Sequence, residues 1–226
     1  MGELYIVATP IGNLKDITLR ALDILKEADL ILAEDTRVTM KILERYELKD
    51  KNLQSYHQHS SREKIQYILD FLSTGKKVAL VSDSGTPGIS DPGNMLIKEI
   101  TGKDPSVKII PIPGPSALAA AASISGFPMD KFIFMGFPPS KKKRKKFFAE
   151  VVESKYPVVL YESPHRILKT IADLKEASQG LDLVVCRELT KKFETVVRGR
   201  ITEIEELLIK SGLKGEFVVV VKNEDR

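Results

Sequence analysis

A loop that follows the apolar run KVALV carries the densest set of residues suited to ligand binding. This loop, SDSGTPGISDPG, runs from Ser82 to Gly93 and contains three glycines, two prolines, three serines and two aspartates. Glycine lets a ligand approach the main chain closely, and proline restricts the chain between the glycines. The loop therefore predicts a functional site at which a ligand approaches the main chain closely. The alternative is a surface Ω-loop in which an aspartate or serine caps a helix that begins at Asn94.

Two shorter loops also follow apolar runs. TPIGNLKDI, from Thr9 to Ile17, contains a Pro-Ile-Gly-Asn turn that suits a similarly close ligand, and its Asp16 is predicted to cap the next helix. AEDTR, residues 33–37, offers two carboxylates and a guanidinium, or else a helix start that Asp35 or Thr36 caps. The chain contains neither the dinucleotide fingerprint after its first strand nor a phosphate-loop motif. ATP and NAD therefore lose their main sequence support as ligands.

The loop YESPHR, residues 161–166, ends another apolar run, YPVVLY. It places a carboxylate (Glu162), an imidazole (His165) and a guanidinium (Arg166) close together. Ionisable groups of three kinds at a strand end suit proton transfer or anion binding. Two alternatives stay open, because Glu162 could form an ion pair with Arg166 and a lone histidine is often structural.

The run KKKRKK, from Lys141 to Lys146, concentrates six positive charges. The chain has 35 Lys and Arg against 31 Asp and Glu, which gives a net charge of +4. Outside the run, 29 positive charges face 31 negative ones, so the whole basic excess lies in one segment. Such a run could attract a polyanion. The alternative is a solvated loop or helix start.

The elements that must position these loops follow from the periodicity of apolar residues. Short apolar runs at residues 4–8, 29–33, 77–82 and 107–112 indicate buried strands. Between them, apolar residues recur at helical spacing over residues 17–28 and 65–72, and Gly75 is a predicted C-cap. The alternation predicts a mostly parallel sheet covered on both faces, with the binding loops at the carboxyl ends of its strands.

A second series of elements follows the stretch PIPGPSALAAAASISG, in which three prolines within five residues interrupt the chain before a small-residue helix. We therefore predict two α/β domains, an N-terminal domain of residues 1–114 and a C-terminal domain of residues 115–226. A hairpin after Cys186 makes the second sheet mixed, and Thr202 and Glu205 form a predicted capping box. The second set of strands is predicted at residues 132–137, 156–161, 181–186, 194–199 and 215–222.

Composition excludes several classes of protein. Of the 226 residues, 42% are hydrophobic and 29% charged, as in soluble globular chains and unlike disordered or collagen-like ones. One cysteine allows no intrachain disulfide, and with only three histidines we expect no metal site. The chain has no apolar run of about 18 residues that would predict a membrane span, and its N-terminus lacks a signal-peptide pattern. We therefore expect a cytoplasmic protein.

Seven segments occur together, in order and at matching spacing, in one known family. TPIGNL, EDTR, SDSGTPGISDPG, PGPSA, YESPHR, RELT and KGEFVVVV resemble the tetrapyrrole-methylase superfamily, and specifically its branch of ribosomal RNA small subunit methyltransferases I. The resemblance covers essentially the whole chain. It implies a two-domain α/β enzyme that binds S-adenosylmethionine in the cleft between its domains and yields S-adenosylhomocysteine. The implied reaction is 2′-O-methylation of the ribose of a cytidine in the decoding region of 16S rRNA, and homodimers are typical of the superfamily.

The resemblance also assigns roles to individual residues. Transfer to a ribose hydroxyl calls for a group that accepts its proton, for which Asp35, Glu162, His165 and Glu188 are unranked candidates. No metal is expected, because the donor is already activated and the protein mainly aligns the reactants. The implied cofactor-binding residues are Pro10, Ile11, Gly12, Ser84, Gly85, Thr86, Pro87, Ile89, Ser90, Ser116, Ala117, Tyr161, Gly215 and Glu216.

Contacts to RNA are expected from basic side chains, because guanidinium groups grip phosphates and lysines neutralise them. These residues are Arg37, Lys141, Lys142, Lys143, Arg144, Lys145, Lys146, Arg166 and Arg187. Single-stranded RNA also favours aromatic stacking, for which Tyr56, Phe147 or Phe148 could serve, although a place in the helix core suits the two phenylalanines better. His57 and His59 are expected to be loop residues rather than ligands.

Two other functions stay open. Another enzyme of the superfamily would methylate a tetrapyrrole or the diphthamide precursor on a protein, but such an acceptor does not need a lysine run. A non-catalytic RNA-binding or ribosome-assembly factor would have an empty methylase-like cleft. The expected partners are 16S rRNA within the small ribosomal subunit and a second copy of the chain. Neither DNA nor a membrane is expected.

Overall fold

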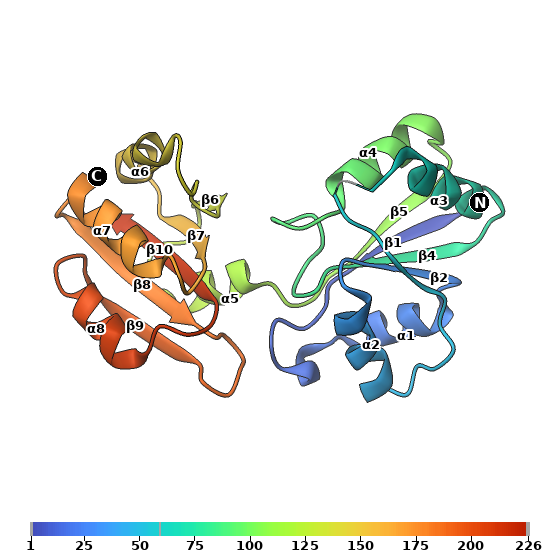
Figure 1. Cartoon of the computed structure of the whole chain (residues 1–226), viewed down its shortest axis with the longest axis horizontal. Coiled ribbons are helices and arrows are strands. Elements are labelled where there is room, and N and C mark those ends of the chain that lie inside the picture. Colours follow the sequence, from blue (N-terminus) through green and yellow to red (C-terminus); the bar gives the residue numbers. More distant parts are fainter. Residues whose placement is uncertain (1, 59, 225–226) are drawn as a thin grey trace. The chain divides into compact units, whose positions relative to one another are not determined.

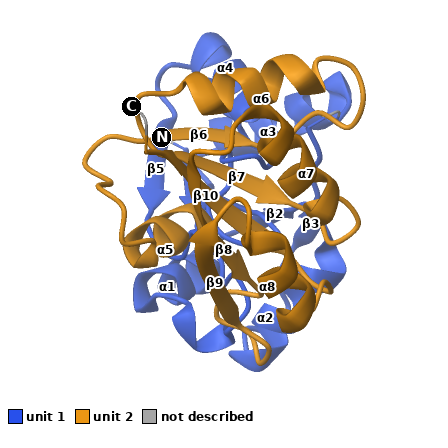
Figure 2. Cartoon of the chain, turned by 90° about the vertical axis from the view of Figure 1, so that its left-hand side faces the viewer, with its two compact units in different colours: residues 1–116 blue, residues 117–226 orange. Residues whose placement is uncertain are grey.

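A computed structural model describes residues 2–58 and 60–224, so His59 lies outside the described residues. The chain divides into two compact units, residues 1–116 and 117–226 (Figures 1 and 2). Each unit contains one five-stranded sheet. The division falls two residues after the boundary that the proline-rich stretch predicts.

The sheet of unit 1 has the strand order β3-β2-β4-β1-β5, and every neighbouring pair is parallel. The apolar runs predict four of these strands. They do not predict β3, because it is a three-residue edge strand with no buried residue. The strands are β1 (Glu3–Val7), β2 (Leu30–Ala33), β3 (Leu53–Ser55), β4 (Lys77–Val81) and β5 (Lys108–Ile112).

Helices cover both faces of this sheet. Tyr5 and Val7 pack in a core with α1 and α2, whereas Leu4 packs in a second core with α3 and α4. Because side chains alternate along a strand, one sheet serves both cores, and its parallel strands all end at one edge. The helices are α1 (Leu19–Glu27), α2 (Thr36–Arg45), α3 (Arg62–Ser73) and α4 (Asn94–Lys103).

Two helix starts in unit 1 differ from the sequence prediction. Thr18 caps α1, because its hydroxyl accepts a hydrogen bond from the N–H of Ala21, whereas Asp16 ends the short 3-10 helix η1 (Leu14–Asp16). Gly93 occupies the N-cap position of α4 and offers no side chain, so the aspartates of SDSGTPGISDPG do not cap this helix. Of the alternatives left open for the AEDTR loop, capping by Asp35 is the one that forms, because its carboxylate accepts a hydrogen bond from the N–H of Arg37 at the start of α2.

The sheet of unit 2 is mixed, with the order β6-β7-β10-β8-β9. β6 and β7 are parallel, whereas β10 is antiparallel to both β7 and β8, and β8 and β9 form the predicted hairpin. β7 and β8 therefore run in the same direction, and their carboxyl ends lie at one edge. The strands are β6 (Ile133–Gly136), β7 (Val158–Glu162), β8 (Leu181–Arg187), β9 (Thr195–Arg200) and β10 (Phe217–Asn223).

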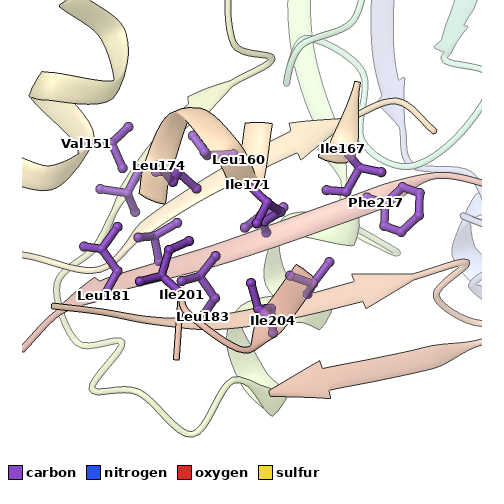
Figure 3. Packing of buried hydrophobic residues seen from close by; sticks show 14 of the residues in the cluster. Val151, Leu160, Ile167, Ile171, Leu174, Leu181, Leu183, Ile201, Ile204 and Phe217 are labelled. Atoms are coloured by element: carbon purple, nitrogen blue, oxygen red, sulfur yellow. The ribbon is translucent and has the colours of Figure 1, made fainter. Parts of the chain in front are cut away.

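One buried core joins this sheet to three of the helices of unit 2. Figure 3 shows Leu160, Ile171 and Phe217 within it, from β7, α7 and β10. The helices of the unit within the described residues are α5 (Ala117–Ile124), α6 (Arg144–Glu153), α7 (Ile167–Ala177) and α8 (Ile204–Ser211). No described helix of the chain is long and apolar enough to cross a membrane.

The capping box predicted from Thr202 and Glu205 does not form. Glu203 occupies the N-cap position of α8 without a side-chain hydrogen bond. Its N–H donates instead to the carbonyl of Arg200, so a backbone turn leads directly into the helix. The prediction was wrong because the helix begins one residue later than expected, so Thr202 lies before the N-cap position.

Candidate functional site

The first two binding loops meet at the carboxyl edge of the sheet of unit 1. The chain leaves β1 toward β2 and leaves β4 toward β5, so the connections of these neighbouring strands lead in opposite directions along the sheet. Open parallel sheets bind ligands at such a switch point, just beyond the carboxyl ends of the strands. TPIGNLKDI follows β1 and SDSGTPGISDPG follows β4, so both loops begin there (Figure 1).

Hydrogen bonds hold these two loops together. The N–H of Thr9 donates to the carbonyl of Gly85 (2.9 Å), and the N–H of Gly85 donates back to the carbonyl of Thr9 (3.1 Å). The hydroxyl of Thr9 donates to Ser82 O (3.0 Å), and that of Thr86 donates to Pro115 O (3.1 Å). The last bond brings in the PGPSA segment after β5. Three segments that the resemblance assigns to the cofactor are therefore neighbours in space.

Gly85 is required by its backbone conformation. Its φ is +83°, a value that residues with a side chain rarely adopt. A Cβ at this position would lie 3.4 Å from Cγ2 of Ile11 and 3.7 Å from the carbonyl oxygen of Pro115, which are close to ordinary contact distances. The glycine thus keeps the bridge to Thr9 in place, and a substitution here would first strain the loop itself.

Some of the predicted cofactor residues of unit 1 are buried and others are exposed. Among the exposed ones, Ile89 stands out because its side chain is apolar and yet 41% exposed. The exposed residues form the surface that a ligand can reach, and the buried ones support it. Buried are Pro10, Ile11, Gly85 and Pro87, exposed are Gly12, Ser84, Ile89 and Ser90, and between these limits are Thr86 and Ser116.

Three carboxyl groups gather where β2 and β4 end. Oδ1 of Asp83 accepts a hydrogen bond from the N–H of Asp35 (2.8 Å), which ties the loop after β4 to the loop after β2. Burial and the negative charges of Glu34 and Asp83 raise the pKa of Asp91 to about 7. Burial and the charge of Asp83 also raise the pKa of Glu34. The set of Glu34, Asp83 and Asp91 is named the acidic trio below.

The acidic trio contains a residue that sequence reasoning missed. A carboxyl group with a pKa near neutrality suits proton transfer, because both of its forms are populated at physiological pH. Asp91 has this property but is not among the predicted proton acceptors. The acids of the trio are visible in the EDTR and SDSGTPGISDPG loops. Their proximity could not be predicted without the strand order, which places β2 next to β4. In the described part of the chain, no group of three or more His, Cys, Asp or Glu is placed to hold a metal ion.

Two of the predicted proton acceptors are already engaged. Asp35 caps α2, and its hydrogen bonds with Arg37 lower its pKa to about 2. Glu188 accepts hydrogen bonds from Nζ of Lys191 (2.9 Å) and from the N–H of Glu216 (3.0 Å). Burial alone would raise the pKa of Glu188, but these hydrogen bonds lower it. Both groups are therefore held as carboxylates by their own neighbours.

Glu162 is a structural residue in this arrangement. It is buried, and its carboxylate accepts hydrogen bonds from Nη2 of Arg166 (2.8 Å), the hydroxyl of Thr170 (2.6 Å) and the N–H of Ser163 (2.8 Å). The ion pair with Arg166 that the sequence left open thus forms. His165 is exposed on the same loop. Both candidates belong to unit 2, whereas the acidic trio belongs to unit 1.

Arg144 does not belong to the exposed part of the lysine run. It is only 6% exposed and forms an ion pair with Asp173. Its guanidinium also donates to the hydroxyl of Thr170 (2.8 Å) and to the carbonyl of Pro139 (2.9 Å), and it lies 4.9 Å from the ring centre of Phe148. Because it is buried and paired, Arg144 does not face RNA as predicted, whereas the five lysines are exposed.

The other predicted RNA-binding arginines differ in how exposed they are and in how many partners they bind. Arg37 has an 87% exposed side chain and pairs only with Asp35 among the contacts described here. Arg166 donates to Pro138 O (3.0 Å) besides its ion pair with Glu162. All three nitrogens of Arg187 donate within the chain, to Thr195, Lys214 and Phe193. Arg37 is therefore the most exposed of the three, because Arg166 and Arg187 are only partly exposed.

Aromatic residues named for RNA stacking are mostly covered. Tyr56 and Phe148 are buried, and Phe147 packs against the core of unit 2, so the stacking role of Tyr56 was wrong. Tyr161 accepts a hydrogen bond from the N–H of Leu118 (3.1 Å). These side chains hold the fold.

Gly215 and Glu216 lie in the turn before β10. The φ of Gly215 is +109°, and a Cβ there would lie 2.4 Å from Cγ of Glu188. Only glycine fits this position. Glu216 is exposed and pairs with Nζ of Lys191 (2.8 Å). The turn is therefore braced against the loop after β8.

Comparisons with known sequences connect this arrangement to a family. Residues 3–205 match the family model of tetrapyrrole (corrin/porphyrin) methylases. The chain is 45% identical over 225 residues to ribosomal RNA small subunit methyltransferase I of Thermotoga maritima, with 100% of both chains covered. It is 41% identical over 226 residues to the protein of that name from Bacillus subtilis, which covers 100% of this chain and 76% of the relative.

Solved structures share the fold at low sequence identity. The methyltransferase CobJ has a TM-score of 0.74 at 19% identity, covering 99% of this chain and 95% of that one. A diphthine synthase has a TM-score of 0.70 at 16% identity, covering 96% and 88%. The prediction of two α/β domains, one with a parallel and one with a mixed sheet, is thereby confirmed.

Proposed function

Because the chain belongs to the ribosomal RNA small subunit methyltransferase I family of the tetrapyrrole methylases, we propose that it methylates small-subunit ribosomal RNA with S-adenosylmethionine. The acceptor we propose is the 2′-oxygen of a cytidine ribose in the decoding region of 16S rRNA. The family's segments along the whole chain support this acceptor. The observation that carries the methyl-transfer part is the convergence of three of these segments at the switch point of unit 1.

The loops around Gly85 fit this donor. When bound, S-adenosylmethionine supplies an electrophilic methyl group on a positively charged sulfur, so the protein mainly has to align the reactants. The exposed residues Gly12, Ser84 and Ser90 offer hydrogen-bonding groups to a polar ligand, and the acidic trio favours a positive charge nearby. We keep the other residues that the resemblance assigns to the cofactor, including Tyr161 of unit 2, as part of the proposal.

We assign the proton-accepting role to Asp91. A ribose hydroxyl holds its proton tightly at neutral pH, so a carboxylate that takes the proton during transfer lowers the barrier. Among the acids discussed, the pKa of Asp91, about 7, is suited to this exchange. Asp35 and Glu162 are bound to their own neighbours and are less suited to it.

We propose that the exposed lysines of the run hold the RNA. Five lysines at 141–143 and 145–146 face solvent, and the buried Arg144 between them pairs with Asp173 of α7. Neutralised phosphates supply much of the affinity of proteins for nucleic acid. Arg37 is the arginine most available for a further phosphate contact. We further propose that the small ribosomal subunit is the physiological substrate and that the chain acts as a homodimer.

The two alternatives have weaker support. Solved methylases whose names concern tetrapyrroles or diphthine are below 25% identical to this chain, whereas relatives named for ribosomal RNA reach 45%. If the chain were a non-catalytic factor that binds no donor, Gly85 and its hydrogen-bonded bridge to Thr9 would serve only the fold.

The decisive experiment incubates small subunits that lack the modification with labelled S-adenosylmethionine and maps the modified nucleoside. We expect label on the ribose of one cytidine of 16S rRNA. Melting of the protein with S-adenosylhomocysteine is the companion measurement, because a ligand bound at one hundred times its Kd stabilises the fold by about 2.7 kcal/mol. No label and no shift in melting would favour the non-catalytic factor, and label on a base would reject the 2′-oxygen.

A further inference from the structure

The hairpin of β8 and β9 ends in a tip that exposes an aromatic ring. Phe193 is 64% exposed, more than any other aromatic side chain in the described ranges. Its neighbours at the tip, Lys191, Lys192 and Glu194, are all polar. A single ring among charges is not the broad apolar patch that protein partners usually bury. A ring beside lysines suits a partner that combines a flat apolar face with negative charge.

The backbone that carries this ring is braced from several sides. Nη2 of Arg187 donates to the carbonyl of Phe193 (3.0 Å), and its other nitrogens hold Thr195 and Lys214 (3.0 Å each). The N–H of Glu194 donates to Lys191 O (3.1 Å). A ring presented on a fixed backbone loses little further freedom on binding. The exposure of the ring is thus built into the hairpin.

The position of the tip within unit 2 points to RNA. β8 and β7 run in the same direction, as do β7 and β6, so the tip and the loop from β6 to the lysine run lie at the same edge of the sheet. Nζ of Lys192 lies 5.6 Å from the centre of the Phe193 ring. A positive charge therefore accompanies the ring, and the chain leaves β6 from the same edge toward the five exposed lysines.

We propose that Phe193 is a stacking platform for one base of single-stranded RNA, and that Lys192 binds a phosphate beside that base. Aromatic rings bind unpaired bases by stacking, and lysines neutralise the adjoining backbone. Lys191 has a different role, because its ammonium is paired with Glu188 and Glu216. This inference rests on the proposed function and adds a specific contact for the nucleotides around the target.

Phe193→Trp gives a direct probe, since the chain contains no tryptophan. The new side chain keeps an aromatic face and becomes the sole tryptophan emitter. Titration with a short single-stranded oligoribonucleotide of the decoding region should change its emission, while RNA affinity stays near that of the wild type. Unchanged emission at saturation, with binding followed independently by a label on the RNA, would overturn the proposal.

Phe193→Ala tests the contribution of stacking to affinity. We expect RNA binding to weaken by about fivefold to 150-fold with an unchanged salt dependence, because no charge is lost. Lys192→Gln should instead reduce the slope of log affinity against log salt by about 0.7. Ile209→Ala is the matched control, because Ile209 is an apolar side chain on α8 with 54% exposure. It should leave RNA affinity unchanged.

Three results would count against the stacking role. Equal RNA affinity of Phe193→Ala and the wild type overturns it while the proposed function stands. Sedimentation that shows Phe193→Ala dissociating a dimer would assign the ring to a second copy of the chain. If the wild type neither binds the RNA nor methylates small subunits, the proposed function fails and this inference fails with it.

Discussion

The acidic trio predicts that Asp91→Asn stabilises the protein at neutral and alkaline pH. In the fold, the pKa of Asp91 rises from its ordinary value of 3.8 to about 7. A group with a raised pKa contributes stability that is fully present below pH 3.8 and is lost as the pH rises through 7. The wild type should therefore lose stability between these values, and Asp91→Asn, which carries no charge, should not.

The size of this effect follows from the shift. About three pKa units at ~1.36 kcal/mol each give an upper limit of ~4 kcal/mol. Since Asp91 is only partly buried, screening by solvent reduces the expected difference to about 2 kcal/mol. Above pH 7 the variant should be more stable than the wild type by about this amount, and near pH 4 the two should be equal.

Denaturant unfolding at a series of pH values measures the difference, and a carbon-13 titration of the Asp91 carboxyl group measures its pKa directly. Asp104→Asn is a suitable control, because hydrogen bonds with Ser106 lower the pKa of Asp104 and the dependence on pH has the opposite sign. Methyl transfer by Asp91→Asn should fall by about 10²-fold or more, which is the usual loss of a general base. Parallel stability curves for variant and wild type would refute the raised pKa, and unchanged methyl transfer would refute the role of proton acceptor.

Four further predictions follow from the structure. Replacing the five exposed lysines of the run with glutamine while keeping Arg144 should flatten the salt dependence of RNA binding by up to about 0.7 per lysine and leave the melting temperature unchanged; anisotropy in a salt series checks this. Arg144→Met should lower the free energy of unfolding by about 3 kcal/mol in denaturant titrations, because it leaves the partly buried Asp173 and the buried Thr170 without the guanidinium, and an effect below 1 kcal/mol would contradict the anchor. Gly85→Ala should destabilise unit 1 by about 1–3 kcal/mol and weaken S-adenosylhomocysteine binding in calorimetry, whereas Gly102→Ala, in open space on α4, should be neutral or stabilising. Glu162→Gln should destabilise the fold by about 1–3 kcal/mol yet leave the pH profile of methyl transfer unchanged; a shifted profile would restore Glu162 as a proton acceptor.

Sequence periodicity predicts most of the strands because burial leaves a direct trace in the residue types. LYIVA and DLILA become the buried strands β1 and β2, and the hairpin after Cys186 forms as expected. Helix caps are predicted less well. They depend on the local backbone conformation, which here puts Asp16 in a short 3-10 helix and Thr18 next to the free N–H groups of α1.

The candidate site could be predicted as loops but not as a geometry. The sequence shows that Glu34 and Asp91 each follow a strand, yet only the strand order places β2 beside β4 and so brings their charges together. Arg144 shows a different limit. Its charge suggests solvent, while its spacing of four and seven residues from Phe148 and Val151 places it on the buried stripe of α6.

The buried position of Arg144 has a consequence for how this surface can change during evolution. The guanidinium joins α6 to α7 through Asp173 and Thr170. Among the flanking lysines, Lys145 also pairs with α7, at Glu176 (3.6 Å), but both of these side chains are exposed, so the pair adds little to stability. The number and identity of the lysines can drift under selection for a different ribosome without loss of the scaffold. A protein of this family that lost the arginine would lose this contact between α6 and α7, however many lysines it kept.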